Sequence, residues 1–246
     1  MPVVSVLTPA TVDRADLLVE AGESLLAQRL PEGWRAEWIV QEDGVAPGLA
    51  AVLDGFPIAR HAANGEQLGA ATTRNLGLTR VTGELVHVLD SDDLLLPDCL
   101  ATAIAAFADH PDVHWVAGQA DDLLPTGERL SFPPVLPPGR IAAGVASALV
   151  AEDRPLPVHP AGLTMRTATV RALGGWTASP RGDDNALLVA IAELAPGYLT
   201  RRVTWLYRKH DGQITGLPYF PVLEPAAWAV VRQRVAALRE VGLRLP

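Results

Sequence analysis

The stretch Leu85-Val86-His87-Val88-Leu89-Asp90-Ser91-Asp92-Asp93 decides how this chain folds. Its apolar half, residues 85–89, predicts a buried strand that stops abruptly at Asp90. The other half places three carboxylates within four residues, and their mutual repulsion indicates a bound cation. Oxygen ligands suit Mg²⁺ or Mn²⁺. Because ligands bind beyond the carboxyl ends of strands in parallel α/β sheets, the cluster lies where a site is expected.

The acidic cluster also has a simpler interpretation. An aspartate can cap the helix that is expected after Pro97, while its acidic neighbours remain in solvent. For an isolated D-x-D-D we would favour that helix cap, so the flanking sequence has to decide between the two.

Short apolar runs alternate with helical patterns on both sides of this stretch, which predicts an α/β fold with a mostly parallel sheet. The expected strands are residues 3–7, 37–41, 56–61, 85–89, 113–118, 161–165 and 204–207. The expected helices are residues 13–28, 68–78, 98–108, 141–151, 184–194 and 225–240. In the second helix Leu68, Ala71, Asn75 and Leu78 share one face, so the Asn75 amide points inward and must find partners.

The last expected helix is amphipathic. Its apolar stripe recurs at spacings of three and four residues and consists of Trp228, Val231, Val235 and Leu238. Pro225 suits the start of the helix and Gly242 its end. We expect this helix to pack on the main domain; a partner or membrane surface is the alternative.

Proline breaks the strand and helix patterns in two places. Residues 132–139 contain four prolines, and Pro155, Pro157 and Pro160 punctuate a second segment. These irregular segments either flank an acceptor site or are plain surface connections.

Composition excludes several classes of protein. The chain of 246 residues has a net charge of −8, which argues against binding nucleic acid through its phosphates. An acidic protein can still hold a phosphate-bearing ligand if a divalent cation bridges the two. Cys99 is the only cysteine, so no intramolecular disulfide or thiolate zinc cluster is expected. With no long apolar segment and no signal-like start, we expect a soluble, cytoplasmic protein without an integral membrane segment.

The flanking sequence resembles the core of the family 2 glycosyltransferases. Residues 61–78 read HAANGEQLGAATTRNLGL and residues 82–93 read TGELVHVLDSDD. In that family an asparagine-glycine segment, an Arg-Asn helix, a Gly-Glu pair and a strand ending in D-x-D-D occur in this order. Thr73 departs from the small residue that usually precedes the Arg-Asn pair. The resemblance implies the GT-A fold and a nucleoside-diphosphate-sugar donor.

The resemblance assigns roles around the acidic cluster. Asp90, with Ser91 beside it, would face the ribose or the sugar, and Asp92 would hold a divalent cation, Mn²⁺ or Mg²⁺. Asp93 would orient the loop or cap the next helix. Arg74 would contact the donor, since a guanidinium matches phosphate oxygens; a surface salt bridge is its alternative.

Two further segments resemble the nucleotide side of the family's site. Thr8 and Pro9 end the first strand like the family's nucleotide-facing turn. Glu42 and Asp43 look like the acidic pair that addresses the nucleobase and ribose, with glutamate in place of the usual first aspartate. A carboxylate can accept the N3–H of uracil or thymine. The alternative is a turn, because Asp43 precedes Gly44.

The second half resembles the family's acceptor side. A Gly-Gly-Trp turn precedes an acidic pair, Asp183 and Asp184, and the resemblance makes Asp184 the general base. Acids in a first helical turn are also favoured by the helix dipole alone. Trp176 either stacks on the acceptor or fills the core. His210 resembles a late histidine that completes the metal shell, and Arg208 a diphosphate contact.

These residues together predict a metal-dependent, inverting glycosyltransferase. It would move a sugar from a nucleotide-sugar donor, with UDP or dTDP preferred, to a small or carrier-bound acceptor, as in natural-product biosynthesis. We expect a GT-A domain at residues 1–215, with a donor half (1–120) and an acceptor half (121–215), and a helical extension at 216–246. A non-catalytic nucleotide-sugar-binding module and a carboxylate-pair glycoside hydrolase are the alternatives. No dinucleotide or P-loop motif is present in the sequence.

Overall fold

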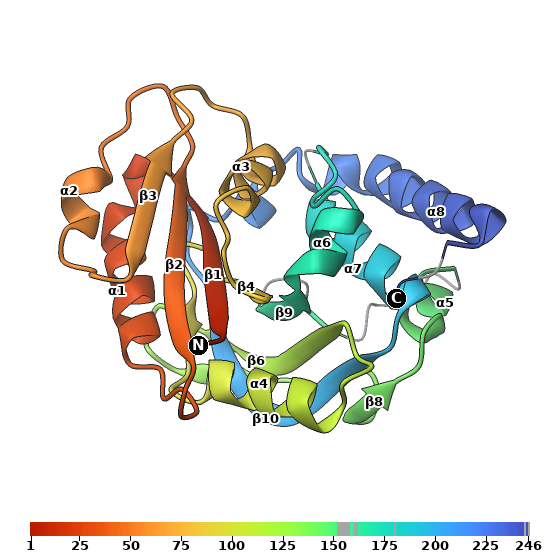
Figure 1. Ribbon diagram of the computed structural model, residues 1–246. Helices are drawn as coiled ribbons and strands as arrows, with labels where there is room; N and C mark the ends of the chain where they lie inside the picture. Colours follow the sequence, from red (N-terminus) through yellow and green to blue (C-terminus); the bar gives the residue numbers. More distant parts are fainter. Residues whose placement is uncertain (152–157, 160–161, 180, 244, 246) are drawn as a thin grey trace.

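The computed structural model describes residues 1–151, 158–159, 162–179, 181–243 and 245. Its centre is one sheet, with strands in the order β3-β2-β1-β4-β9-β6-β10-β5, while β7 pairs with β6 and β8 with β10 (Figure 1). The strands are β1 (Val3–Ala10), β2 (Arg35–Glu42), β3 (Ala59–Ala63), β4 (Leu85–Val88), β5 (Leu94–Leu95), β6 (Trp115–Leu123), β7 (Arg129–Ser131), β8 (Gly139–Ile141), β9 (Leu163–Arg166) and β10 (Gly197–Arg208). Pro155, Pro157 and Pro160 themselves lie outside the described residues.

Helices cover both faces of the sheet. The α-helices are α1 (Ala15–Leu26), α2 (Ala50–Leu53), α3 (Ala70–Leu78), α4 (Cys99–Asp109), α5 (Val145–Ala151), α6 (Thr167–Ala172), α7 (Asp183–Leu194) and α8 (Glu224–Val241), and three short 3₁₀ turns are η1 (Val12–Arg14), η2 (Ile214–Gly216) and η3 (Pro221–Leu223). One apolar core joins α1 and α4 to the sheet through Trp38 and Leu100. A second joins α3, α6 and α7 to the other face through Leu7 and Ile39.

Strands β1 to β4 form the parallel part of the sheet. β1 pairs in parallel with β2 and β4, and β2 with β3. Beyond β4 the sheet is mixed, because β9 runs antiparallel to both β4 and β6. The expected α/β class with a central parallel sheet flanked by helices is confirmed. The carboxyl ends of β1, β2 and β4 therefore meet at one edge, directly before Asp43 and Asp90.

Several element boundaries differ from the sequence predictions. The third strand begins at Ala59 and not at residue 56, because the Phe56 ring turns into the core against Trp38, with ring centroids 5.2 Å apart. Leu68 precedes α3 and is exposed, so it does not share the buried face of that helix. The helix expected at residues 141–151 begins at Val145, since residues 139–141 form an edge strand.

Helix α8 packs on the main body, as the amphipathic pattern predicts. Val231 and Val235 are buried against Ala186 and Val189 of α7. Gly242 ends the helix in a left-handed conformation with φ of 66°. Figure 1 shows α8 lying beyond α6 and α7 at the outer side of the molecule. Within the described part of the chain, no helix combines the length and apolar character needed to span a bilayer.

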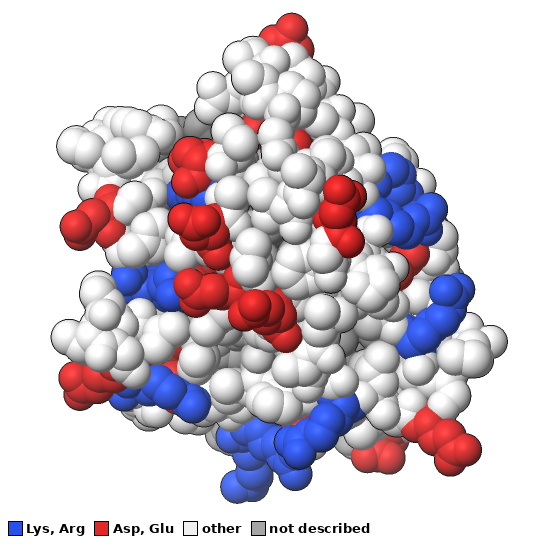
Figure 2. Space-filling model, turned by 90° about the vertical axis from the view of Figure 1, so that its left-hand side faces the viewer, with Lys and Arg blue, Asp and Glu red and all other residues white. Residues whose placement is uncertain are grey.

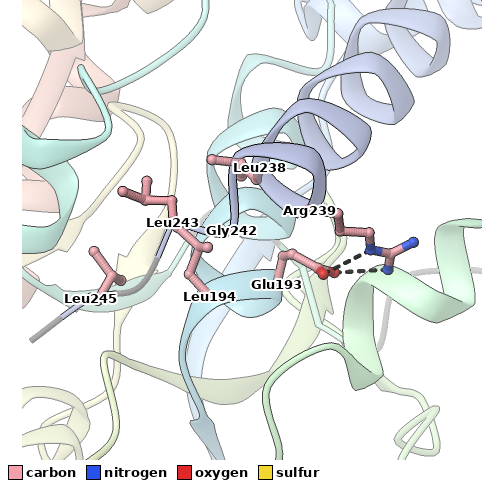
Figure 3. Close-up of a pocket in the computed structure, with 7 residues that line it drawn as sticks. All are labelled: Glu193, Leu194, Leu238, Arg239, Gly242, Leu243 and Leu245. Atoms are coloured by element: carbon pink, nitrogen blue, oxygen red, sulfur yellow. Dashed lines mark hydrogen bonds and ion pairs between the residues drawn. The ribbon is translucent and has the colours of Figure 1, made fainter.

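The ends of α7 and α8 are joined by an ion pair beside a shallow cavity of about 390 Å³. Arg239 donates two hydrogen bonds to Glu193, each 2.8 Å long (Figure 3). This contact lowers the pKa of Glu193. The apolar side chains around the cavity are Leu194, Leu238, Leu243 and Leu245. The pair fixes the C-terminal end of α7 to α8.

The outer face over α1 is rich in acidic residues. Figure 2 shows acidic side chains across the middle of the face and basic ones at its left, right and lower edges. Helix α1 contributes the exposed residues Asp16, Glu20 and Glu23. This face therefore carries charges of both signs, with acidic side chains most frequent at its centre.

The close packing of β10 on β6 yields a stability prediction. A Cβ on Gly197 would lie 1.9 Å from a ring atom of Trp115, which is fully buried. Gly197→Ala must therefore displace a large core ring, and we expect it to lower the free energy of unfolding by about 1–3 kcal/mol. Urea denaturation followed by far-UV circular dichroism measures the change. Gly55→Ala is the control, because a Cβ at Gly55 meets no atom within 4 Å. Equal unfolding midpoints for the two variants would contradict the prediction.

Candidate active site

A cavity of about 500 Å³ opens at the carboxyl ends of β1, β2 and β4. Of the residues singled out from the sequence, those that line it are Pro9, Asp43, Arg74, Asp90, Ser91 and Asp92. The opposite wall comes from the turn after β10 and from η2, with Gly212, Ile214 and Leu217. The structure thus brings together residues that are far apart in the sequence.

Arg74 is the centre of the charge network beside this cavity. Its side chain comes from α3, and the residue is 4% exposed. One guanidinium nitrogen lies 2.6 Å from Asp90 Oδ1, and the other lies 2.8 Å from Asp183 Oδ2 and 3.2 Å from Asp184 Oδ1. Burial lowers the pKa of Arg74, but the three carboxylates outweigh that effect and raise it. The alternative of a surface salt bridge is therefore wrong.

One buried cation cannot neutralise three carboxylates, and burial raises the pKa of the two acids at the start of α7. Burial, against the opposing charge of Arg74 and with the added charges of Asp183 and Asp90, raises the pKa of Asp184 to about 7. Burial also raises the pKa of Asp183. A carboxylate with a pKa near neutrality can take up a proton at physiological pH.

Trp176 holds Asp184 in place. Its indole N–H donates a hydrogen bond of 3.0 Å to Asp184 Oδ1, and the residue is 2% exposed within the core under α7. The ring therefore offers no face to an acceptor in this structure, which differs from the expectation of acceptor stacking. The side chain fills the core and at the same time orients the acid.

Asn75 in turn holds Trp176. Its amide donates to the Trp176 carbonyl (2.8 Å) and accepts from the Trp176 backbone N–H (2.9 Å). The inward-pointing amide therefore finds partners, as predicted. Gly175 adopts φ of 71°, and a Cβ there would lie 2.1 Å from Asn75 Oδ1. Only glycine allows this close approach between α3 and the turn before α7.

Asp92 lies at the meeting point of two basic side chains. Arg14 and His210 both contact Asp92 Oδ2, at 2.7 and 3.0 Å. A carboxylate oxygen and an imidazole nitrogen that converge in this way fit the protein part of a divalent-cation shell. Over the described ranges of the chain, no group of three or more His, Cys, Asp or Glu side chains gathers for a metal. Phosphate oxygens and water would have to complete such a shell.

Asp93 and Arg208 tie the acidic loop to β10. Asp93 is buried, and its Oδ1 accepts the Arg208 backbone N–H at 3.0 Å. Burial raises the pKa of Asp93 well above its usual value, and Asp90 and Asp92 add to the rise. The Arg208 side chain donates to the Asp92 carbonyl (2.8 Å) and pairs with Glu20 (2.5 Å). Asp93 thus orients the loop, while Arg208 is held by protein groups and not directed toward a diphosphate.

Two of the expected nucleotide contacts are structural in this geometry. Thr8 is 0% exposed, and its hydroxyl oxygen accepts the indole N–H of Trp38 at 2.9 Å. Glu42 is 1% exposed and accepts the backbone N–H groups of Gly48 and Leu49. Both side chains are committed to the core or to a loop, so they do not face the cavity.

Asp43 fixes a loop and also lines the cavity. Its carboxylate accepts the backbone N–H groups of Leu68 (2.7 Å) and Gly69 (2.9 Å), which fixes the loop before α3. It also lines the cavity. The Asn64 amide also donates to Asp43 Oδ1 (3.0 Å), so the capacity to accept a further donor from a ligand lies at Oδ2.

Comparison with known proteins decides the family. The model of "Glycosyl transferase family 2" matches residues 5–129, which are 125 of the 246 residues. The chain belongs to glycosyl transferase family 2. No curated protein sequence matches it.

Solved structures agree with the fold of this family 2 chain. The crystal structure of S. aureus TarS 1-349 in complex with UDP-GlcNAc aligns with a TM-score of 0.73 and 17% identity, covering 95% of this chain and 65% of that one. TarS 1-349 in complex with UDP aligns with a TM-score of 0.70 and 16% identity, covering 96% and 65%. S. aureus TarS aligns with a TM-score of 0.69 and 15% identity, covering 97% and 39%. The family 2 chain thus spans less than two thirds of the length of these neighbours, which support its fold.

Two parts of the family 2 chain's cavity were missed from the sequence. Arg14 ends the short turn η1 after the first strand, and it contacts Asp92 across 78 positions. The segment after His210 lines the cavity through Ile214, Leu217 and Tyr219. The one sequence feature that points to Arg14 is its position in the first turn after β1. The segment after His210 that lines the cavity carries no recognisable motif.

The Arg74 network yields a stability prediction. Arg74→Met leaves three buried or half-buried carboxylates without their cation, so we expect the free energy of unfolding to fall by about 3–5 kcal/mol at pH 8. The loss should shrink toward pH 5, because protonation removes the unpaired charges. Urea denaturation at both pH values measures it. Arg29→Met is the control: its ion pair with Asp98 is 70% and 45% exposed, and it should contribute less than about 1 kcal/mol. A loss at Arg74 no larger than the control's contradicts this account of the network.

Proposed function

We propose that this chain transfers a sugar from a nucleoside-diphosphate sugar, with UDP or dTDP preferred, to a small or carrier-bound acceptor. The observation that carries the proposal is the Arg74 network, which joins Asp90 at the donor cavity to Asp183 and Asp184 at the start of α7. Family membership and the described complexes of TarS 1-349 with UDP-GlcNAc and UDP support a nucleotide-sugar donor.

The donor is held at the carboxyl ends of β1, β2 and β4. Asp43 accepts an N–H of the base, and Asp90 and Ser91 face the ribose or the sugar. Pro9 forms the wall on the β1 side. This assignment is supported by the position of all four residues on the 500 Å³ cavity, and by the general preference for ligands at this end of a parallel sheet.

Asp92 and His210 hold a divalent cation, Mn²⁺ or Mg²⁺, together with phosphate oxygens and water. When bound, such an ion offsets the negative charge that grows on the leaving diphosphate. The 3.0 Å contact between His210 Nε2 and Asp92 Oδ2 supports this pairing. Asp93 fixes the loop through its hydrogen bond with the Arg208 backbone N–H and would not be a ligand of the ion.

Asp184 is the general base. Its pKa of about 7 lets the carboxylate take the acceptor's proton near neutral pH. Trp176 and Arg74 orient it, and the charge of Asp183 raises its basicity. The acceptor attacks the anomeric carbon opposite the diphosphate, so a single displacement inverts the configuration. Residues 1–120 serve the donor and 121–215 the acceptor, except that His210 and the cavity-lining residues from Gly212 to Tyr219 belong to the donor side. The rest of the 216–246 extension supports α7.

Calorimetric titration of UDP, dTDP and GDP, with and without Mn²⁺, tests the donor site. We expect one of these nucleotides to bind only with Mn²⁺, because the ion bridges an acidic site to an anionic ligand. Asp92→Asn should weaken that binding by more than about tenfold, equivalent to about 1.4 kcal/mol. Asp98→Asn is the matched control, since Asp98 is exposed and pairs with Arg29. Absence of binding under every condition would contradict both the proposed donor site and the nucleotide-sugar-binding module, and would favour the glycoside hydrolase alternative.

The pH dependence of turnover tests the base. Donor hydrolysis or transfer, followed by NMR, also reports whether the product anomer is inverted. Because the base acts deprotonated, kcat/KM should fall as pH drops through about 7. Asp183→Asn should move this limb to lower pH, since the charge of Asp183 raises the pKa of Asp184. Trp176→Phe should move it upward, since the indole hydrogen bond lowers that pKa. An unmoved limb in both variants, or a retained anomer, contradicts the assignment.

A further inference from the structure

The positively charged guanidinium of Arg14 lies beside Asp92, the proposed ligand of the divalent cation. Arg14 is the last residue of η1, the turn between β1 and α1. Its guanidinium lies 2.7 Å from Asp92 Oδ2 and donates a second hydrogen bond of 2.9 Å to the Gly212 carbonyl. The Arg14 side chain is 20% exposed and that of Asp92 10%. The ion pair is therefore largely shielded from water and stronger than a surface pair.

The guanidinium of Arg14 contacts Asp92 Oδ2, the carboxylate oxygen that also faces His210. His210 Nε2 lies 3.0 Å from the same Asp92 Oδ2 that Arg14 contacts. An ion coordinated by both Asp92 and His210 would come within a few ångströms of the guanidinium. Two cations at that separation repel each other strongly in a shielded site. The Arg14 contact and a metal ion at Asp92 therefore exclude each other.

The same guanidinium also joins two walls of the cavity. Arg14 belongs to the turn after β1, and Gly212 to the turn after β10 that leads into η2. At the far end of that wall Arg181 donates to the Phe220 carbonyl (2.6 Å) and lies over the Phe220 ring. The segment between Gly212 and Phe220 is thus held at both ends. The contact at Gly212 comes from Arg14, which also pairs with Asp92, whereas the contact at Phe220 comes from Arg181.

We propose that Arg14 is a built-in counter-cation that competes with the divalent ion for Asp92. When the ion and donor bind, the guanidinium leaves Asp92 and pairs with a donor phosphate, for which its planar N–H fork is suited. The proposal rests on the proposed metal site. It predicts opposite effects of one substitution: without Arg14 the ion alone binds more tightly, and the nucleoside diphosphate binds more weakly.

Manganese titration followed by the EPR signal of free Mn²⁺ separates these effects from activity. In Arg14→Ala we expect the affinity for Mn²⁺ alone to rise about tenfold and the affinity for UDP at saturating Mn²⁺ to fall about tenfold. Arg29→Ala, which removes an exposed ion pair, should leave both constants unchanged. The double variant Arg14→Ala/Asp92→Asn should lose the gain in Mn²⁺ affinity, which shows that the ion binds at Asp92. Circular dichroism checks that each variant is folded.

The outcomes distinguish the two proposals. Equal or weaker Mn²⁺ binding by Arg14→Ala, with normal binding by the unmodified chain, overturns the competition and leaves the metal site intact. Unchanged UDP affinity in Arg14→Ala overturns the transfer of the guanidinium to a phosphate. If neither protein binds Mn²⁺ even with UDP present, the metal site is wrong and the inference falls with it.

Discussion

The structure depends on one buried cation shared among three acids. Arg74 reaches Asp90 from the donor side and both members of the acidic pair at the start of α7. Because these acids come from segments far apart in the sequence, the guanidinium fixes the two halves of the site relative to each other. It also leaves the network short of positive charge, which is why burial can bring the pKa of Asp184 to about 7. The same buried network therefore joins the two halves of the site and includes the acid whose pKa is raised, Asp184.

A second layer of contacts makes that arrangement rigid. Asn75 is the neighbour of Arg74 on α3 and clamps both backbone polar groups of Trp176. Trp176 then directs its indole N–H to Asp184. The chain of contacts runs from helix to turn to acid, and Gly175 supplies the backbone conformation that allows it. Such support keeps a reacting group within the small displacement that catalysis tolerates.

Much of this was readable from the sequence, because it follows local patterns. The strand that ends at Asp90, the inward amide of Asn75 and the apolar stripe of α8 each follow from the spacing of a few neighbouring residues. Thr8, Glu42 and Trp176 were misjudged because their partners are tertiary: Thr8 meets Trp38 from the next strand, and Glu42 meets backbone N–H groups of a loop. Arg14 was missed for the same reason, since its partner lies 78 positions away. Burial of a polar side chain cannot be seen in a one-dimensional pattern when the covering group comes from elsewhere.

The packing of α8 holds the C-terminal end of α7, so a tilt of α7 about that end would move the acids at its N-terminal end. The acidic pair stands at its first turn, and the Arg239–Glu193 pair secures its last. Twelve residues at 1.5 Å each make the arm about 18 Å long, so a tilt of about 3° at the secured end moves the acids by about 1 Å. A displacement of that size can cost about a hundredfold in rate. The outer helix therefore helps to hold the acidic pair of α7 in position.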